Sequence, residues 1–446
     1  MRNDRPNVVV FFTDQQRWDT AGVHGNPLDL MPNFDRIAKS GTHVHQSITC
    51  QPVCGPARSC LQTGLYATTT GCFRNGIPLP EDSKTLAHYF GESGYHTGYI
   101  GKWHLADTGP GAVPEENRFG YQYWLASNVL EFTSDAYDTV MYDNDNQPVK
   151  LPGYRVDAQT DAAIRYIDTH QDDPFFLFLS YLEPHHQNHL DDYPPPDGYR
   201  ERYTAKWIPP DLAALRGSTH QHLAGYYGMV KRLDEAFGRL LDTLKSLGLA
   251  ENTIVLFTSD HACHFKTRNS EYKRACHDSA VRVPTALQGG CFVGGGEIQE
   301  LVSLIDLPPT LLDAAGISVP EQMQGRSILP LIQGQRENWP KEAFIQISES
   351  HVGRAIRTTK WKYSVRAPER HGGRDAGSDL YVEEFLYDLE ADPYELRNLI
   401  EAESHAEVCQ QLRQRLIKRM VEAGETAPAI ETATKQASGQ RRVSLE

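Results

Sequence analysis

Four short apolar runs constrain the fold of this 446-residue chain more than any other feature of its sequence. Each run is rich in β-branched and aromatic residues, and each one ends in acidic, basic or imidazole side chains. With their polar ends the runs read NVVVFFTDQQ, TGYIGKWH, FFLFLSYLEPHH and NTIVLFTSDH. Continuous apolar runs of this length are typical of strands that are buried on both faces of a parallel sheet.

Helical patterns lie between these runs. Residues 156–170 and 218–247 carry apolar side chains at helical spacing. The segment MPNFDRIAKSG has Pro32 near its start and Gly41 at its end, and SKTLAHYFGESG is expected to begin at a Ser83 cap. This alternation predicts an α/β fold with a large, mostly parallel central sheet flanked by helices.

A mostly polar segment with Gly and Pro, IQGQRENWPKE at residues 332–342, indicates a domain boundary. We expect a first domain over residues 1–340 and a smaller C-terminal α+β subdomain over residues 341–446. The subdomain has strand patterns in RAIRTTKWKYSVR and FLYDLEADPYELRNL, followed by a helix. A polar tail begins at about residue 424, and we expect it to lack regular structure.

Charge and composition exclude several classes of protein. The formal net charge of −14 leaves no positive excess for phosphates, so we expect neither nucleic acid nor an anionic membrane as a partner. No run of 18 apolar residues occurs, so no membrane span is expected. The start, MRNDRPNVVVFF, does not have the design of a signal peptide. We therefore expect a cytoplasmic protein, or a periplasmic or secreted one whose export signal has been removed. The eight cysteines form no CxxC pair and are expected to be mostly buried thiols.

The polar ends of the four runs are expected to meet, because ligands of such folds bind outside the carboxyl ends of the strands. Asp14, Asp260 and His261 would come together there. With the amide oxygen of Gln15 they offer a hard-oxygen site suited to Ca²⁺ or Mg²⁺, while the imidazole leaves Mn²⁺ or Zn²⁺ open. The alternative is that each acidic residue only caps a neighbouring turn.

Cationic and imidazole side chains reach the same edge of the predicted sheet: Arg58, Lys102, His104 and His185. A metal ion with Lys and Arg for charge and His for proton transfer suits an anionic tetrahedral group. A lone Lys or His is more often part of the surface or the core, so this hypothesis depends on their shared location.

Cys54, in the stretch TCQPVCGPARSCLQTG, is harder to explain from the residues alone. A thiolate at a helix N-terminus beside Arg58 would be activated, which makes a cysteine nucleophile one interpretation. A hard metal ion is a poor match for a soft thiolate, however. A buried inert cysteine does not account for the surrounding Pro, Gly and Arg.

The segment CGPARSCLQTG resembles the C-x-P-x-R signature of the type I sulfatases, the formylglycine-dependent family of the alkaline-phosphatase-like superfamily. Further segments along most of the chain are similar to motifs of that family, in the same order. They are GNPLDLMPNFDRIAKSG, GYIGKWHL, LEPHH, TSDH, KRACHDSAVRVP and LYDLEADPYELRNL. The resemblance implies an alkaline-phosphatase-like fold, with residues 1–340 as the sulfatase catalytic domain.

The same resemblance implies that Cys54 is converted to formylglycine by a formylglycine-generating or anaerobic maturation enzyme. The modified Cys54 would then bind one divalent metal together with Asp14, Gln15, Asp260 and His261. We expect Ca²⁺, with Mn²⁺ or Mg²⁺ as alternatives. The Asp-Gln and Asp-His combination departs from many family members and also resembles phosphonate monoester hydrolases.

The implied reaction is hydrolysis of a sulfuric ester. One hydroxyl of the formylglycine hydrate, polarised by the metal and Arg58, attacks sulfur while Lys102 and Lys273 hold the sulfate oxygens. His185, by its match to the family's P-H motif, protonates the leaving alcohol, with the adjacent His186 as the alternative acid. The second hydroxyl, deprotonated with help from His104, then collapses to the aldehyde and expels sulfate.

The expected substrate is a sulfated carbohydrate or another organic sulfate, with a phosphodiester or phosphonate monoester as the alternative. His186, His264 and Arg268 are candidates for substrate contacts, although surface structure is the competing explanation for each. Members of the family often associate, so a homo-oligomer is a further expectation.

Two other classes of function fit the sequence less well. A non-catalytic relative should have lost one of the signature residues, and none is missing. A structural zinc module built from Cys263, His264, Cys276 and His277 does not have the spacing of such modules.

Overall fold

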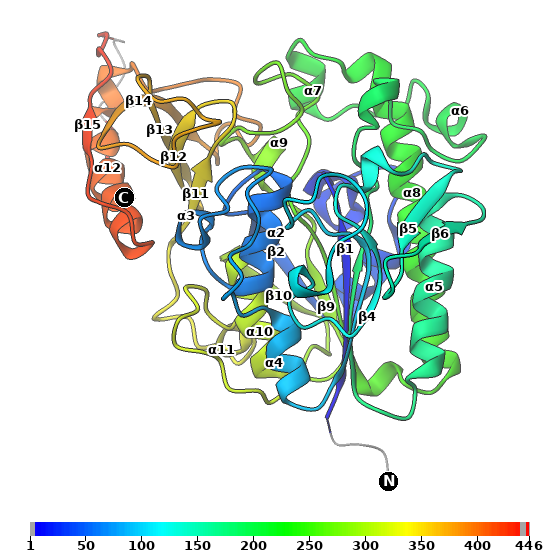
Figure 1. Ribbon diagram of the computed structural model, residues 1–446. Coiled ribbons are helices and arrows are strands. Elements are labelled where there is room, and N and C mark those ends of the chain that lie inside the picture. The colour runs from blue at the N-terminus through cyan, green and yellow to red at the C-terminus, as the bar shows by residue number, and fades with distance from the viewer. Residues whose placement is uncertain (1–4, 438–442, 446) are drawn as a thin grey trace.

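The computed structural model describes residues 5–437 and 443–445, and its centre is a ten-stranded sheet (Figure 1). In spatial order its strands are β10 (Gly296–Ser303), β2 (Thr42–Ile48), β9 (Ala286–Gln288), β8 (Thr253–Ser259), β1 (Asn7–Thr13), β7 (Phe175–Ser180), β3 (His96–Lys102), β4 (Tyr123–Ser127), β5 (Thr139–Tyr142) and β6 (Pro148–Leu151). The run β8–β1–β7–β3–β4 is parallel, as is the β10–β2 pair. The predicted large, mostly parallel sheet is confirmed.

Helices cover both faces of this sheet (Figure 1). One face packs against α1 (Pro32–Ser40), α5 (Arg155–Thr169) and α8 (Thr219–Ser246), and the other against α2 (Cys54–Thr63), α4 (Leu86–Glu92) and α10 (Leu307–Ala314). Along β1, Val9 and Phe11 belong to the first core while Val8, Val10 and Phe12 belong to the second. Alternate residues of one strand thus fill two cores, which is why the run is apolar throughout.

The shorter helices connect these layers. They are α3 (Ala67–Thr70), α6 (Tyr199–Tyr203), α7 (Pro210–Ala214), α9 (Asp278–Val281) and α11 (Leu329–Ile332). One helix start differs from the expectation. The cap of α4 is Thr85 and not Ser83, because the Thr85 side chain and His88 form a reciprocal capping box.

A second, five-stranded sheet follows α11 along the chain. Its strands, in spatial order, are β11 (Glu342–Ile347), β12 (Val352–Thr358), β13 (Trp361–Ala367), β14 (Leu380–Asp388) and β15 (Ala429–Glu431). Helix α12 (Ala406–Glu422) packs on it through Val408, Leu412 and Leu416. The segment after residue 424 does not lack regular structure throughout, because residues 429–431 pair with the open edge of β14.

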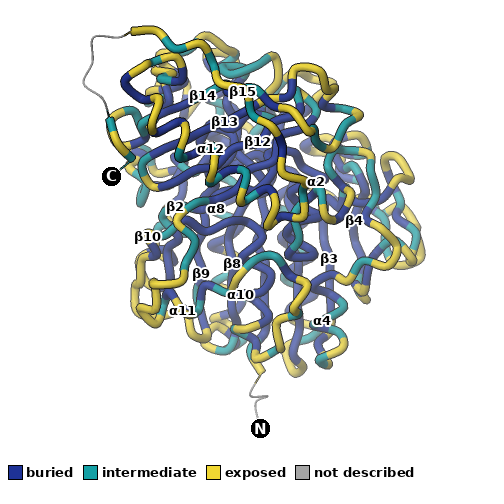
Figure 2. The backbone as a smooth tube through the Cα atoms, turned by 90° about the vertical axis from the view of Figure 1, so that its left-hand side faces the viewer, coloured by how far each residue is buried: buried dark blue, intermediate teal, exposed yellow. Residues whose placement is uncertain are grey.

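The buried strands of both sheets lie beneath exposed loops (Figure 2). All eight cysteines are free thiols and seven of them are buried. Among the helices in the described part of the chain, none has the length and apolar character that crossing a membrane would require.

Candidate active site

The carboxyl ends of β1 and β8 bring two acidic residues together. Thr13 and Ser259 are register partners at the ends of these parallel strands, so the next residues, Asp14 and Asp260, lie side by side. Lys102 ends β3, whose neighbouring Gly101 has φ +115° and leaves no room for a Cβ atom against the Ser180 carbonyl oxygen. Glycine is needed there because β3 and β7 approach closely just before the lysine.

Helix α2 presents Cys54 and Arg58 on one face. Cys54 is the first residue of the helix and Arg58 follows one turn later. Pro56 lies within the first turn, where a missing N–H costs nothing, and Gly64 closes the helix at φ +72°. All ten residues of α2 are buried, so the helix is a fixed part of the core.

Arg58 ties the two carboxylates to the sheet. Its guanidinium donates to Asp14 Oδ2 at 3.0 Å and to Asp260 Oδ2 at 3.2 Å. It also donates to the carbonyl oxygen of Lys102 at 2.9 Å and to Ser180 Oγ at 2.7 Å. Lys102 Nζ donates to Asp14 Oδ2 at 2.8 Å. Oδ2 of each aspartate is therefore held by a cationic side chain, and Oδ1 of each lies within 3.7 Å of His261 Nε2.

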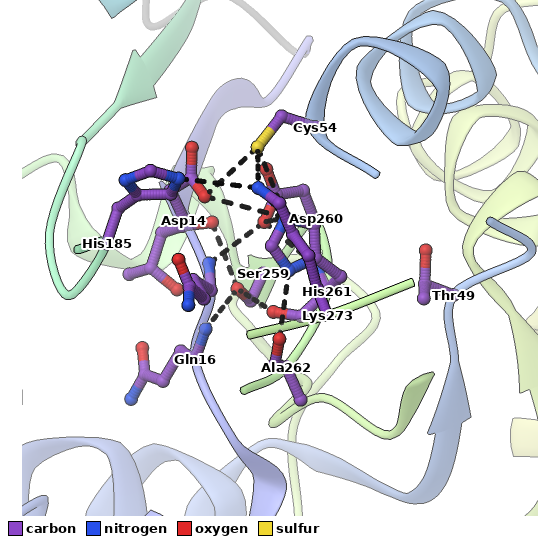
Figure 3. A network of polar contacts seen from close by, with 12 residues as sticks. Asp14, Gln16, Thr49, Cys54, His185, Ser259, Asp260, His261, Ala262 and Lys273 are labelled. Carbon is purple, nitrogen blue, oxygen red and sulfur yellow. Dashed lines mark hydrogen bonds and ion pairs between the residues drawn. The ribbon is translucent and has the colours of Figure 1, made fainter. Parts of the chain in front are cut away.

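Four buried donor atoms converge on one point (Figure 3). Asp14, Cys54, Asp260 and His261 each offer an atom within 4.8 Å of the others. Cys54 Sγ lies 3.2 Å from His261 Nε2 and 3.5 Å from Asp14 Oδ1. His261 Nδ1 contacts the Ala262 carbonyl oxygen at 3.0 Å, which turns the Nε2 lone pair toward the other donors.

This donor set fits a divalent cation. Two carboxylates supply charge and an imidazole supplies a neutral nitrogen, in a cluster with no exposed member. The soft sulfur of Cys54 is the one poor ligand for a hard ion, and an oxygen at that position would remove the mismatch.

Gln15 lies beside the same donors. Its backbone has φ +69°, a left-handed conformation that is costly for a non-glycine residue and is often found at functional sites. Its backbone N–H donates to Asp260 Oδ1 at 3.0 Å, and its side-chain amide donates to Tyr193 Oη at 3.1 Å and to Cys263 Sγ at 3.3 Å. Because the nitrogen end of the amide is held in this way, the carbonyl end is the one available to an ion.

The charges of the cluster shift several pKa values. Burial alone would raise the pKa of the Cys54 thiol, but the nearby cations Lys102 and Lys273 lower it well below its usual value. Burial would also raise the pKa of Asp14, and here Lys102 and Arg58 are among the charges that lower it. The pKa of Asp260 is raised by burial and by the charge of Asp14. The negative charges of Asp14 and Asp260 thus repel each other, and a bound cation would offset this repulsion.

Three further predicted residues surround Cys54. Lys273 Nζ lies 2.7 Å from Cys54 Sγ and 3.3 Å from His185 Nε2. His185 Nδ1 contacts the His186 carbonyl oxygen at 2.6 Å, which assigns its proton to Nδ1 and faces Nε2 toward the lysine. His104 lines the same cavity as Cys54 and has a left-handed backbone at φ +63°.

These residues open into a cavity of about 410 Å³. No sequence motif indicated several of the residues that line it, among them Asn75, Glu131 and Phe132. Asn75 Oδ1 accepts the Gly55 N–H at 2.9 Å, and Glu131 Oε1 accepts from Lys102 Nζ at 3.0 Å. The one sequence signal for Glu131 is that it is a single acid among the apolar residues of NVLEF. In the structure this segment contains a 3₁₀ turn (Leu130–Phe132).

The three candidates for substrate contacts lie in different places. His186 lines the cavity, and its ring stacks on Tyr272 with the ring centres 4.4 Å apart. His264 is fully buried and contacts the Lys273 carbonyl oxygen at 3.0 Å, so it supports the lysine segment from behind. Arg268 donates to the carbonyl oxygens of Tyr394 and Glu395 in the C-terminal region. The structure therefore brings only His186 to the cavity.

Fold and site together define a class of protein. A mostly parallel α/β sheet with carboxylates, lysines and an arginine at its carboxyl edge is the architecture of the alkaline-phosphatase-like hydrolases. Two solved structures share this fold. One was determined in complex with its substrate D-glucosamine-2-N,6-O-disulfate (TM-score 0.78, 23% identity, 94% of this chain and 98% of that chain). The other is the phosphonate monoester hydrolase of Agrobacterium radiobacter (TM-score 0.71, 22% identity, 94% and 96%).

The chain belongs to the sulfatase family, whose pattern matches residues 6–317. A second pattern, N-sulphoglucosamine sulphohydrolase, C-terminal, matches residues 271–422. An ulvan-active sulfatase of Formosa agariphila is 31% identical over 439 residues, which cover 94% of this chain and 82% of the relative. The predicted family and fold are confirmed, and the protein is a sulfatase, an enzyme that hydrolyses sulfate esters.

Proposed function

We propose that this sulfatase releases sulfate from a sulfated carbohydrate, using formylglycine formed from Cys54 and one divalent metal ion. The observation that carries the proposal is the position of Cys54. Its Sγ lies among a carboxylate, an imidazole and two lysines at the N-terminus of a fully buried helix. The metal would be held by Asp14, Gln15, Asp260, His261 and the modified Cys54. We expect Ca²⁺, because most of these ligands are oxygens.

When present, the formylglycine hydrate supplies an oxygen nucleophile and the metal ion draws negative charge from the sulfate oxygens. The rest of the chemistry belongs to the side chains of the chain. Lys273 and Lys102 lie 2.7 and 3.8 Å from Cys54 Sγ, so an anionic group beside residue 54 meets two ammonium groups. They stabilise the charge that gathers on the sulfate oxygens in the transition state. Arg58 holds Asp14 and Asp260 in place through a hydrogen bond to each.

Proton transfer falls to two of the histidines that line the cavity, His185 and His104. His185 Nε2 faces Lys273 while Nδ1–H is held by a backbone carbonyl, so Nε2 of the doubly protonated ring is the nitrogen that gives its proton to the leaving alcohol. His104 lines the cavity beside Cys54 and has a buried Nδ1 atom with no partner among the described residues. It is placed to take a proton from a hydroxyl at residue 54.

A sugar is the substrate class that the cavity favours. Phe132 lines it with 59% of its surface exposed, and Tyr272 lines it as well. An exposed ring such as that of Phe132 can stack on the apolar face of a sugar. Asn75, Asn188 and Arg274 supply polar groups to the same cavity. The related structure with a disulfated glucosamine as its substrate supports this assignment.

A second candidate activity is hydrolysis of a phosphodiester or phosphonate monoester. It is favoured by the Asp260–His261 pair in the metal donor set and by the shared fold of the phosphonate monoester hydrolase. Sulfate monoesters and phosphodiesters both present a tetrahedral anion of similar charge. Turnover of the two ester types, measured side by side on the same preparation, separates the two candidates.

The test of the nucleophile is peptide mass spectrometry across residues 49–65, on protein co-expressed with a formylglycine-generating enzyme. We expect an aldehyde at Cys54, while Cys50 and Cys60 of the same peptide stay thiols as internal controls. Sulfate release should rise in proportion to the modified fraction. An unmodified Cys54 in protein that releases sulfate at full rate would contradict the proposal.

A further inference from the structure

A second cluster of metal-ligating side chains lies on β2 and β10, at the edge of the central sheet. His43 and His45 are two residues apart on β2, so their side chains project from the same face. Glu297 on β10 is the register partner of His43, which puts its side chain on that face as well. The strand ladder thus places two imidazoles and one carboxylate together on rigid backbone.

The separations within the cluster match those around a tetrahedral ion. Glu297 Oε1 lies 3.1 Å from His45 Nδ1 and 3.4 Å from His43 Nδ1. With metal–ligand bonds of about 2.0–2.1 Å, two ligands of tetrahedral Zn²⁺ lie roughly 3.3 Å apart. One ligand atom from each of the three residues lies within 4.8 Å of the others.

A third imidazole, that of His24, contacts His43 on the ring nitrogen that does not face Glu297. His24, at the end of a 3₁₀ turn (Gly22–His24), has its Nε2 3.2 Å from Nε2 of His43. Metal-binding histidines usually donate their second ring N–H to a fixed partner, which sets the tautomer. A proton on His43 Nε2, donated to His24, leaves the lone pair of His43 Nδ1 directed at the Glu297 side.

The ligand types of the cluster select the kind of ion. Two imidazoles and a single carboxylate offer more nitrogen than oxygen, whereas Ca²⁺ and Mg²⁺ prefer sites built from oxygens. Nitrogen ligation therefore favours a borderline metal such as Zn²⁺.

We propose that His43, His45 and Glu297 bind a Zn²⁺-type metal ion, with His24 as the supporting partner of His43. The His45 and Glu297 side chains are 35% and 46% exposed, so water can reach the fourth position. This site is separate from the catalytic donor set and does not depend on the proposed reaction. A bound ion would fasten the 3₁₀ turn of His24, which follows the catalytic aspartate loop, to the edge of the sheet.

The test is isothermal titration of ZnCl₂ into the metal-stripped full-length chain. We compare the wild type with His45→Ala and Glu297→Gln, and use His96→Ala as a matched control. His96 is a half-exposed histidine whose Nε2 lies 3.8 Å from a carboxylate oxygen of Asp173. Other zinc-binding groups, including the catalytic donor set, are common to all four proteins. We expect the wild type and the control to bind one more equivalent than the two cluster variants.

A second measurement uses Co²⁺ in place of Zn²⁺. The difference spectrum between the wild type and Glu297→Gln should contain the visible bands of a four-coordinate cobalt ion. Glu297 is a partly exposed carboxylate on an edge strand, so its replacement tests the site even if His45→Ala perturbs the fold. Equal zinc stoichiometry in the wild type and Glu297→Gln, with no cobalt difference spectrum, would overturn the proposal.

Discussion

Replacing Glu131 with glutamine tests how the buried charges of the active site stabilise the fold. Glu131 is 5% exposed, and its Oε1 accepts from Lys102 Nζ at 3.0 Å. Its Oε2 is buried without a hydrogen-bond partner among the described residues. The carboxylate is therefore held in place chiefly by its attraction to the lysine.

The magnitude follows from the pKa of this carboxyl. Burial would raise it, but Lys102, His185 and His104 lower it from the usual 4.5 to about 2. A depression of that size corresponds to about 3 kcal/mol of stability at neutral pH. A glutamine still accepts a hydrogen bond from Lys102, which retains about 1 kcal/mol. We therefore expect Glu131→Gln to lower the free energy of unfolding by about 2 kcal/mol at pH 7.

The pH dependence has a definite sign. Because the folded pKa is depressed, the stabilisation is complete above pH 4.5 and is lost as the pH falls from 4.5 toward 2. The difference between wild type and variant should be constant from pH 7 to pH 5 and smaller at pH 4.

The assay is urea denaturation followed by tryptophan fluorescence, since Trp103 and Trp124 lie in one of the two cores of the central sheet. Glu271→Gln is the matched control. That glutamate lines the same cavity but is half-exposed and pairs with Arg274 at 3.2 Å, so its loss should cost at most about 1 kcal/mol. Equal stability of Glu131→Gln and Glu271→Gln at pH 7 would refute the reasoning.

Further predictions concern catalysis and metal binding. Cys54→Ala should abolish sulfate release without changing the circular dichroism spectrum, and turnover at the wild-type rate would defeat the mechanism. Asp260→Asn should weaken metal retention, because the donor set loses one of two buried charges; unchanged metal content by elemental analysis would remove Asp260 from the site. His185→Ala should slow sugar sulfates by about 10²–10⁴-fold but aryl sulfates with good leaving groups far less, since a stable phenolate needs no proton. Equal losses on both substrates would exclude the acid role. Phe132→Ala should raise KM for a sugar sulfate by about 2- to 10-fold, as expected for one lost stacking contact, and an unchanged KM would contradict stacking.

Much of the architecture was predictable because strand identity and strand ends are local properties. The apolar runs marked β1, β3, β7 and β8, and the polar residues after them marked the edge at which ligands bind. The motif around Cys54 predicted a helix start, and Cys54 is the first residue of α2. These features follow from short stretches of sequence in which side-chain pattern and turn chemistry agree.

Other features depended on contacts between distant segments. The pairing of residues 429–431 with β14 was not expected from a polar tail, because edge pairing depends on what lies beside the segment. His264 and Arg268 belong to a promising polar stretch, yet one supports Lys273 from behind and the other bonds to carbonyl groups of the C-terminal region. The direction of a loop side chain is decided by the fold around it.

The sequence by itself determined the order of the strands along the chain, the residues that follow them and the family to which they belong. Only the tertiary structure decided that Glu131 faces Lys102 across 29 residues of chain and that His24 and Glu297 come within reach of His43. Neither contact follows from a local pattern, because both arise where separate strands and turns are packed against each other. Charge pairing and metal ligation act over a few ångströms in space, and sequence separation carries no information about such distances.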